Sequence, residues 1–270
     1  MAKLKLPVPP IPPQLKPLPK RPGKVYGPQT PLEHAGEAAA TAVGWIDERT
    51  SLSGAARWMM FRKVPKGTNW FYTLGSATMF SFLSQAVTGI FLAMYYVPSS
   101  TRAYESIRYI NNDVFLGEFV HGMHKWGSSM MVILIFLHMG RTFFFGAYKY
   151  PRELNWVIGV VLLILTMTMS FTGYLLPFDQ RSYWASIVGV NINGTGPLVG
   201  PYLSDFLRAG PNFGATTLSR FYAIHMLLLP GAIAALMGFH LYLVAKLGTT
   251  APPWQRATSS EELREEQVSS

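Results

Sequence analysis

Three long stretches of this sequence contain no charged residue, and they constrain the fold more than any other feature. No Asp, Glu, Lys or Arg occurs between positions 67 and 101, 154 and 178, or 221 and 245. Each stretch exceeds the ~20 apolar residues that a helix needs to cross a bilayer. Only 14% of the chain is charged, whereas soluble domains average about 25%. The sequence therefore predicts an all-α membrane protein.

A fourth apolar stretch runs from 119 to 145 and carries only two charges. Lys125 and Arg141 lie near its two ends, where long basic side chains can extend into polar surroundings. We therefore expect four transmembrane helices that form a four-helix bundle. Their predicted ranges are 71–97, 119–145, 155–177 and 219–246.

The basic residues predict which ends of these helices face the cytoplasm. Eleven Lys or Arg residues precede position 67, and the connection between the second and third helices adds Lys149 and Arg152. The two other connections hold only five, namely Arg102, Arg108, Arg181, Arg208 and Arg220. The positive-inside rule then places both termini on the inner, cytoplasmic side. The net charge of +9 reflects this topology and gives no reason to expect nucleic-acid binding.

The sequence divides into three parts. Residues 1–39 contain the Pro-rich run KLPVPPIPPQLKPLPKRP, which predicts an extended or disordered arm, and they have no apolar h-region of a signal peptide. Residues 40–250 form the transmembrane domain, which begins with a predicted amphipathic interfacial helix in the segment 44–65. Residues 251–270 are predicted to be a solvated tail.

Two pairs of histidines repeat at a spacing of about four helical turns. His124 and His138 are fourteen residues apart and His225 and His240 fifteen, while four turns take up ~14.4 residues. The two histidines of one helix are ~21 Å apart along its axis, too far to share a metal ion. Because the second and fourth helices cross in the same direction, His124 should lie level with His225, and His138 with His240. Two imidazoles at each level are what a low-spin haem iron requires.

Other roles for these histidines remain as alternatives. An isolated intramembrane histidine more often forms a hydrogen bond or relays protons than binds a metal. A zinc site would need three or four ligands at each level, and no other His, Cys or acidic residue recurs at both levels. His121 lies three residues before His124, and we expect it to have a propionate or surface role rather than to ligate.

Glycines repeat at the same spacing in the first and third helices. Gly75 and Gly89 are fourteen residues apart, as are Gly159 and Gly173. Glycine inside a helix costs stability relative to alanine, so its repetition needs a cause. Small residues can let membrane helices approach one another. The matching period on all four helices favours a second account, in which each glycine leaves room for the edge of a flat macrocycle.

Five stretches together resemble the cytochrome b family, and most of all its short, split form, cytochrome b6. They are FYTLGSATMFSFLSQAVTGIFLAMYY, HKWGSSMMVILIFLHMGR, KYPRELNWVIGV, TGYLLPFDQRSYWA and RFYAIHMLLLPGAIAALMGFHL. The resemblance covers about residues 40–250, and the fifteen-residue histidine spacing also resembles the b6 form.

The resemblance implies two non-covalent b-type haems. His124 and His225 would ligate the iron of an outer haem, and His138 and His240 that of an inner haem. Haem packing and propionate contacts would involve Gly75, Gln85, Gly89, Lys125, Arg141, Gly159 and Gly173. For Lys125 and Arg141, anchoring at the membrane interface is an alternative role.

The resemblance also implies a quinol-oxidation site. Its wall would consist of Gly173, Tyr174, Leu176, Pro177 and Phe178. Tyr183 and Trp184 would lie on the surface helix that follows. Phe178 stands where the family usually has tryptophan, so contacts in this wall are expected to differ from the family pattern. A plain apolar wall is the alternative role of this stretch.

The implied function is that of a subunit in a quinol:cytochrome c or plastocyanin oxidoreductase. A quinol at the outer side would give one electron to a Rieske iron–sulfur protein and the other to the outer haem. The second electron would cross to the inner haem and reduce a quinone, with proton translocation across a bacterial cell membrane or an equivalent energy-transducing membrane. The implied partners are the Rieske protein, a c-type cytochrome subunit and a second copy in a dimeric complex.

A further subunit is also expected. Longer family members carry a Pro-Glu-Trp-Tyr motif in the quinol-oxidation pocket, and no such tetrapeptide occurs here. The chain also ends soon after the fourth helix. A separate subunit should therefore carry the C-terminal part of cytochrome b, and this chain should be inactive alone.

Two functions of other classes remain as alternatives. One is a dihaem membrane anchor that links a dehydrogenase or hydrogenase to the quinone pool, and the other is a haem-free transporter with histidine proton relays. Reduced-minus-oxidised spectra distinguish the transporter, and co-purification of a Rieske protein distinguishes the anchor.

The chain has no cysteine, which narrows the set of cofactors. Disulfides, thiolate-bound iron–sulfur clusters and thioether-linked haem all require a thiol. In cytochrome b6 a cysteine near the inner start of the first helix can tether a third haem, and Thr73 stands at that position here. We therefore expect no covalently bound haem.

Overall fold

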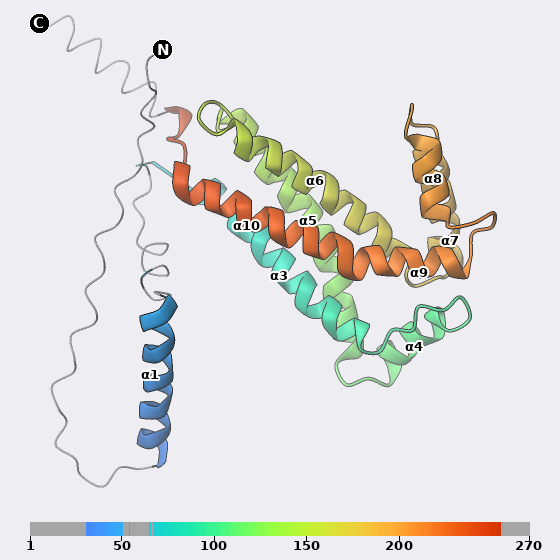
Figure 1. Cartoon of the computed structure of the whole chain (residues 1–270), viewed down its shortest axis with the longest axis horizontal. Helices are drawn as coiled ribbons and strands as arrows, with labels where there is room; N and C mark the ends of the chain where they lie inside the picture. The colour runs from blue at the N-terminus through green and yellow to red at the C-terminus, as the bar shows by residue number, and fades with distance from the viewer. Residues whose placement is uncertain (1–30, 51–53, 55–64, 66, 255–270) are drawn as a thin grey trace, which may run out of the picture. The chain divides into compact units, whose positions relative to one another are not determined.

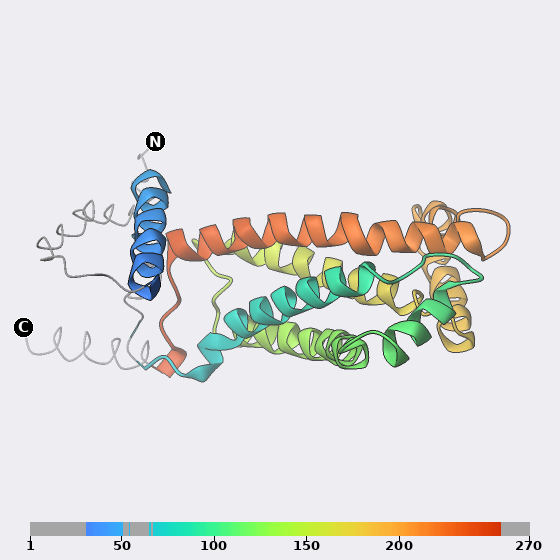
Figure 2. The same cartoon turned by 90° about the horizontal axis from the view of Figure 1, so that it is seen from below.

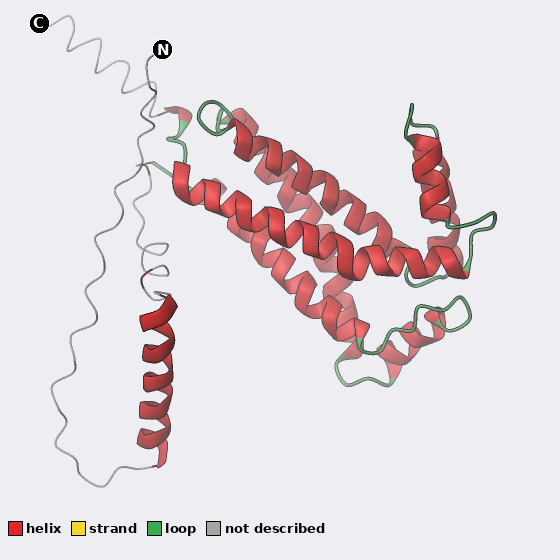
Figure 3. Cartoon of the chain, viewed as in Figure 1, coloured by secondary structure: helices red, strands yellow, loops and turns green. Residues whose placement is uncertain are grey.

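The computed structural model describes residues 31–50, 54, 65 and 67–254. The chain divides into two compact units, Met1–Val64 and Pro65–Ser270. The described residues form helices, turns and loops, without a β-strand (Figure 3). The prediction of an all-α fold is confirmed.

Within the first unit, helix α1 spans Pro31–Thr50. Residues 31–39, which the sequence analysis assigns to the extended arm, are therefore helical. The run LEHAGEAAA is rich in Ala and Glu, which favour helices, and proline is well tolerated at a first helical position. Residues 1–30 of the predicted arm, most of the interfacial segment after position 50, and residues 255–270 of the predicted tail lie outside the described residues.

Four helices of the second unit are long and apolar enough to cross a membrane (Figures 1 and 2). The first joins the 3₁₀ turn η1 (Trp70–Thr73) to α3 (Leu74–Ala93), and the second and third are α5 (Gly117–Phe144) and α6 (Glu153–Tyr174). The fourth joins α9 (Ala215–Ala223), the π-helical turn η2 (Ile224–Leu228) and α10 (Leu229–Leu247). The prediction of four transmembrane helices is confirmed.

Two of these helices end earlier than the sequence predicts. Helix α3 ends at Ala93 rather than 97, and α6 ends at Tyr174 rather than 177. Prolines follow both ends, at positions 98 and 177. A proline disfavours helical geometry in the residue before it and removes a backbone donor, so the chain leaves the helix before reaching it.

The four long helices pack as two contacting pairs. Helix α3 packs against α5, and α6 packs against α10. Buried apolar side chains join the helices in the middle of the bundle, among them Phe82, Met131 and Ile233. Large apolar side chains also point outward: Phe80 is 73% exposed and Leu227 is 78% exposed. Such exposure is expected of side chains that face lipid.

Three short helices lie at one end of the four long ones (Figure 2). Helix α4 (Ala103–Asn112) connects α3 to α5, while α7 (Gln180–Gly194) and α8 (Gly200–Arg208) connect α6 to α9. Asp179 caps α7 by accepting a hydrogen bond of 2.7 Å from the backbone N–H of Ser182. We refer to this end as the α4 end; the short connection between α5 and α6 lies at the opposite end.

Candidate cofactor-binding site

Four histidines meet as two pairs inside the bundle. The ring centroids of His124 and His225 are 6.4 Å apart, with ring planes at 76°. Those of His138 and His240 are also 6.4 Å apart, with planes at 78°. The first pair lies toward the α4 end and the second toward the opposite end. The structure thus brings together the same residues that the sequence analysis pairs.

A π-helical turn reconciles the two different spacings along the chain. His124 and His138 lie on one continuous α-helix, whereas His225 lies within η2 and His240 on α10. A π turn contains about one residue more than an α turn because its hydrogen bonds run to the fifth residue. The extra residue between His225 and His240 is therefore taken up in η2, and both pairs keep the same separation.

Hydrogen bonds orient the rings of the first pair. Nδ1 of His225 lies 3.1 Å from the carbonyl oxygen of Met169 and 3.2 Å from Oγ1 of Thr172. Because a carbonyl oxygen only accepts, Nδ1 of His225 carries the proton and donates it. Nδ1 of His124 lies 2.9 Å from Oγ1 of Thr88, whose hydroxyl donates to a carbonyl one turn earlier in α3. In both rings Nε2 is left with a lone pair for a metal ion.

The second pair lacks this hydroxyl shell. The residues fourteen positions before Thr88 and Thr172 are the buried aliphatic residues Leu74 and Ile158. Nδ1 of His240 is buried without a hydrogen-bond partner. The two imidazole pairs therefore have the same spacing but different polar surroundings.

The four repeated glycines lie against the four imidazole rings. A Cβ atom at each glycine would approach Cε1 of a histidine, at 2.5 Å for Gly173 and His225, 3.1 Å for Gly75 and His138, 3.2 Å for Gly89 and His124, and 3.6 Å for Gly159 and His240. The sequence analysis attributes the glycines to the edge of a macrocycle. In the structure a Cβ at Gly75, Gly89 or Gly173 would crowd an imidazole ring, so these three glycines allow close packing of a histidine, whereas at Gly159 it would make ordinary contact. The macrocycle edge stays a prediction.

A cavity of about 610 Å³ surrounds the first pair and is lined by all four long helices. This volume lies within the ~300–1,000 Å³ typical of ligand pockets. The lining residues that the sequence analysis had singled out are His124, His225, Gln85, Gly89, Lys125, Gly173, Tyr174, Leu176 and Pro177. The haem-packing and quinol-wall residues predicted at this level thus share one cavity. His121 also lines it, and its Nδ1 lies 2.8 Å from Oδ1 of Asn111 on α4.

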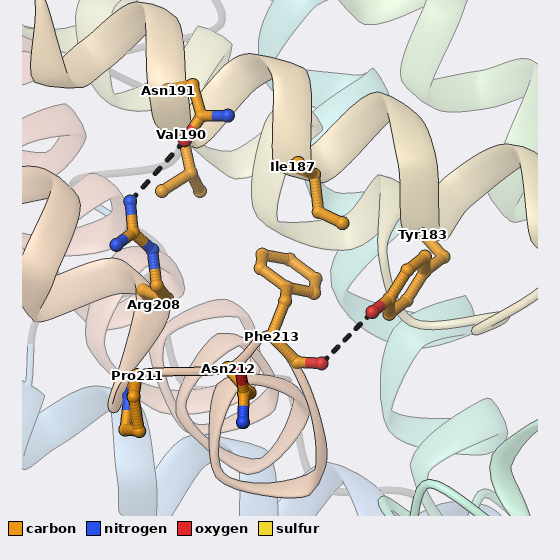
Figure 4. Close-up of a pocket in the computed structure, with 8 residues that line it drawn as sticks. All are labelled: Tyr183, Ile187, Val190, Asn191, Arg208, Pro211, Asn212 and Phe213. Carbon is orange, nitrogen blue, oxygen red and sulfur yellow. Dashed lines mark hydrogen bonds between the residues drawn. The ribbon is translucent and has the colours of Figure 1, made fainter.

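Phe178 is not among the residues that line this cavity. Its backbone is left-handed, with φ of 51°, and its ring makes an edge contact with Tyr183 at 5.7 Å between centroids. Tyr183 donates a hydrogen bond of 3.2 Å to the carbonyl of Phe213 (Figure 4). Phe178 thus contacts a residue, Tyr183, that lines a second cavity of about 350 Å³ beside α7. Trp184, the next residue, is exposed.

Besides His240, two polar side chains among the described residues have buried nitrogen atoms without a hydrogen-bond partner. They are Nε2 of Gln85, near the first pair, and Nε and Nη2 of Arg141, near the second pair. The Arg141 guanidinium stacks 3.7 Å from the ring centroid of Tyr72. Buried donors without a partner are costly, so these groups indicate an additional acceptor, and for Arg141 an anionic one.

The donor set excludes a multi-ligand metal site among the described residues. No group of three or more His, Asp or Glu side chains comes close enough to hold one metal ion there. Each histidine pair thus offers two nitrogen ligands, which suits a metal whose remaining positions are filled by a macrocycle.

Comparison with known proteins identifies the family. The family described as Cytochrome b/b6/petB matches residues 59–248. The chain belongs to the cytochrome b family. Among its relatives, the menaquinol:cytochrome c reductase cytochrome b subunit of Geobacillus thermodenitrificans is 41% identical over 216 residues, which cover 77% of this chain and 96% of that protein. Cytochrome b6 of Heliobacterium modesticaldum is 40% identical over 212 residues, covering 78% of this chain and 100% of that protein.

A solved structure has the same fold. A chain of the "Hyperthermophilic respiratory Complex III" superposes with a TM-score of 0.70 at 32% identity and covers 76% of this chain. The match includes 55% of that chain, so the present protein spans about half of its length. The resemblance stated from the sequence is confirmed.

Membership of the cytochrome b family implies that the chain binds b-type haem, and the residues present fit that cofactor. Two metal–imidazole bonds of about 2 Å, together with about 1 Å from each bonded nitrogen to its ring centre, span about 6 Å. The centroids of both histidine pairs are 6.4 Å apart. The partnerless donors of Gln85 and Arg141 and the large cavity add polar contacts and space of the kind a macrocycle with carboxylates requires.

Several residues of the site were missed by the sequence analysis. Thr88 and Thr172 carry no signal of their own, but each immediately precedes one of the repeated glycines as a Thr-Gly dipeptide. That repetition on two helices is the pattern that points to them. The carbonyl of Met169 and the π turn have no comparable signature, apart from the extra residue in the histidine spacing.

Proposed function

We propose that this chain carries electrons across the membrane through two non-covalent b-type haems, from a quinol oxidised on one side to a quinone reduced on the other. It is the cytochrome b subunit of a quinol:cytochrome c type of oxidoreductase, in line with its relatives. One observation carries the proposal. Two histidine pairs lie at two levels of the same helix bundle, and in each pair the ring centroids are 6.4 Å apart.

Each haem has a defined set of protein partners in this proposal. His124 and His225 hold one iron through Nε2, and His138 and His240 hold the other. Bound haem supplies one-electron redox chemistry, and the chain fixes its position and tunes its potential. Because the chain contains no thiol, both haems are held without covalent bonds.

Basic and amide side chains near the two levels are assigned to the haem edges. Arg141 offers a buried guanidinium with two donors lacking a partner, which suits a propionate at the His138–His240 level. Lys125 lines the cavity of the His124–His225 level and is exposed, so it can reach a carboxylate at the rim. Gln85 presents its buried amide nitrogen at the same level.

We assign the wall of the quinol-oxidation site to the chain between Gly173 and Phe178. Tyr174, Leu176 and Pro177 line the same cavity as His124 and His225. A quinol ring against this wall would therefore be close to the first iron site, and the apolar lining would exclude water around it. Phe178 contributes from behind the wall through its contact with Tyr183.

The sidedness of the reaction follows from the distribution of charge. The basic residues before position 67 and in the α5–α6 connection support a cytoplasmic position for the end opposite α4. The α4 end, with the large cavity, then faces outward, and both termini are cytoplasmic. In this orientation quinol oxidation releases protons outside and quinone reduction takes them up inside.

The proposed partners are a Rieske iron–sulfur protein, a c-type cytochrome subunit and a separate subunit with the C-terminal part of cytochrome b, in a dimeric complex. The relationship to cytochrome b subunits supports this assignment over a dihaem anchor for a dehydrogenase or hydrogenase. Purification of the tagged chain from its native membranes tests it. We expect two b-type haems per chain, a co-purifying Rieske protein and quinol:cytochrome c reductase activity. A dehydrogenase as the co-purifying partner, without a Rieske protein, would favour the anchor instead.

A further inference from the structure

A buried tyrosine joins the end of the first transmembrane helix to the chain segment after the third. The hydroxyl of Tyr96 donates a hydrogen bond of 2.6 Å to the carbonyl oxygen of Leu176, eighty residues away in the sequence. Tyr96 follows the last residue of α3 by three positions, and Leu176 lies between α6 and α7. Both residues line the cavity of about 610 Å³ around His124 and His225.

The carbonyl of Leu176 lies beyond the end of α6 and needs a hydrogen-bond partner from another part of the chain. Helix α6 ends at Tyr174, and Pro177 follows Leu176 directly. Proline has no backbone N–H and interrupts the helical hydrogen-bond pattern, so carbonyl groups in this segment lie outside regular structure. The Tyr96 hydroxyl supplies the donor and thereby fixes the position of the peptide that leads into Pro177.

The surroundings of Tyr96 make this bond well defined. Its side chain is 8% exposed and belongs to a buried cluster that includes Leu175 and Phe221. Its ring contacts that of Tyr222, with centroids 5.5 Å apart. Tyr222 precedes His225 by three residues. Tyr96 lies beyond the membrane-spanning part of α3, and burial raises its pKa, so the phenol stays protonated and donates.

We propose that Tyr96 is a positioning residue for quinol oxidation: its hydroxyl holds the Leu176–Pro177 part of the wall in the shape that binds the quinol. This role rests on the proposed function, because it requires a quinol in the cavity beside His124 and His225. Tyr96 acts through the backbone of Leu176 and does not itself exchange protons or electrons with the substrate.

The test is the Tyr96→Phe substitution in the purified complex, with steady-state quinol:cytochrome c reductase kinetics as the readout. The ring and its packing are retained, and only the hydroxyl is lost. We expect the KM for quinol to rise about fivefold, the factor for one hydrogen bond of about average strength, while kcat changes by less than about twofold. The haem difference spectrum and the thermal midpoint of the complex should match the unsubstituted protein, which distinguishes positioning from a general loss of structure.

Tyr95→Phe is the matched control. Tyr95 undergoes the same chemical change one residue away, packs on Phe91 with centroids 5.4 Å apart, and is not among the residues that line the cavity. The KM for quinol of the Tyr95→Phe variant should stay unchanged. An unchanged KM in Tyr96→Phe, or a loss of haem and thermal stability without a change in KM, would overturn the positioning role. Absence of quinol oxidation in the unsubstituted complex would instead refute the proposed function, so the two failures are distinguishable.

Discussion

Gly173 and His225 are packed so closely that the glycine cannot be replaced without moving the imidazole. A Cβ atom at position 173 would lie 2.5 Å from Cε1 and 3.1 Å from Nδ1 of His225. The same ring is held by the Met169 carbonyl and the Thr172 hydroxyl of helix α6. One turn of α6 therefore sets both the position and the protonation of a histidine on the neighbouring helix.

The Gly173→Ala substitution should therefore displace His225 and weaken one haem. The clash is comparable to overpacking a core, which costs about 1–3 kcal/mol, so the component ligated by His124 and His225 should be depleted in reduced-minus-oxidised spectra. The component ligated by His138 and His240 should persist. Gly231→Ala is the control, because a Cβ atom at Gly231 meets nothing within 4 Å. Equal haem content in the two variants would contradict the packing argument.

The π turn predicts which single-residue deletions the bundle tolerates. Deleting Leu227, which is 78% exposed within η2, should convert the π turn to an α turn and leave His225 and His240 fourteen residues apart. Both haem components should then be retained. Deleting Ile133 from the regular helix α5 offers no such compensation, because one residue less rotates His124 by ~100° relative to His138.

Haem content of the purified deletion variants is the measurement for this prediction. The Ile133 deletion should lose at least one component. This loss would be due to the change of register, because the exposed side chain of Ile133 contributes little packing of its own. Loss of a component in the Leu227 deletion, or retention of both in the Ile133 deletion, would refute the role of η2 in register.

Removing the Thr88 hydroxyl should raise the potential of the haem ligated by His124. The hydroxyl accepts a hydrogen bond from Nδ1 of His124 at 2.9 Å, which makes the imidazole a stronger donor to iron and favours the ferric state. In Thr88→Val, redox titration should show that haem shifted upward by tens of millivolts, with the other haem unchanged. Thr78→Val is the matched control, because among the described residues the Thr78 hydroxyl bonds only to the carbonyl of Leu74. A downward shift would contradict the assignment.

Neutralising Arg141 should lower the potential of the other haem. Its guanidinium is partly buried over Tyr72 with two donors lacking a partner, and a nearby positive charge stabilises the reduced, more negative haem. In Arg141→Gln we expect a decrease on the order of 50 mV for the haem ligated by His138 and His240. Lys149→Gln, which removes an exposed charge in the α5–α6 connection, should shift neither haem. Equal shifts of the haem potential in both variants would indicate a general effect of positive charge and would contradict the specific role of Arg141.

The sequence predicts the transmembrane helices and the histidine pairs for a simple physical reason. Charge is costly in a bilayer, so long uncharged runs mark the spanning helices, and alternate helices must cross in the same direction. His124 and His225 are then brought to one level by period and direction alone. The ends of the helices are less predictable, because Pro98 and Pro177 act a few residues before their own positions.

Other features depend on contacts between segments far apart in the chain. The bond from Tyr96 to Leu176 joins residues separated by eighty positions, and no local pattern marks it. Helix α4 was missed because it is short and lies between charged residues. The glycine repeat is visible in the sequence, but the contacts of Gly75 and Gly173 with His138 and His225 are not, since these histidines belong to other helices. Helical residues 31–39 were missed because nine prolines before them dominate the composition of that region.

The central claim is that each haem iron is held between two helices by one histidine from each, and replacing the four histidines singly tests it most directly. Redox titration of the purified complexes carrying His124→Leu, His225→Leu, His138→Leu or His240→Leu resolves which haem component each variant loses. The account predicts that His124 and His225 variants lose one component, and that His138 and His240 variants lose the other. If variants on the same helix, such as His124→Leu and His138→Leu, lost the same component, or if any variant retained both components, the proposed ligation would be wrong.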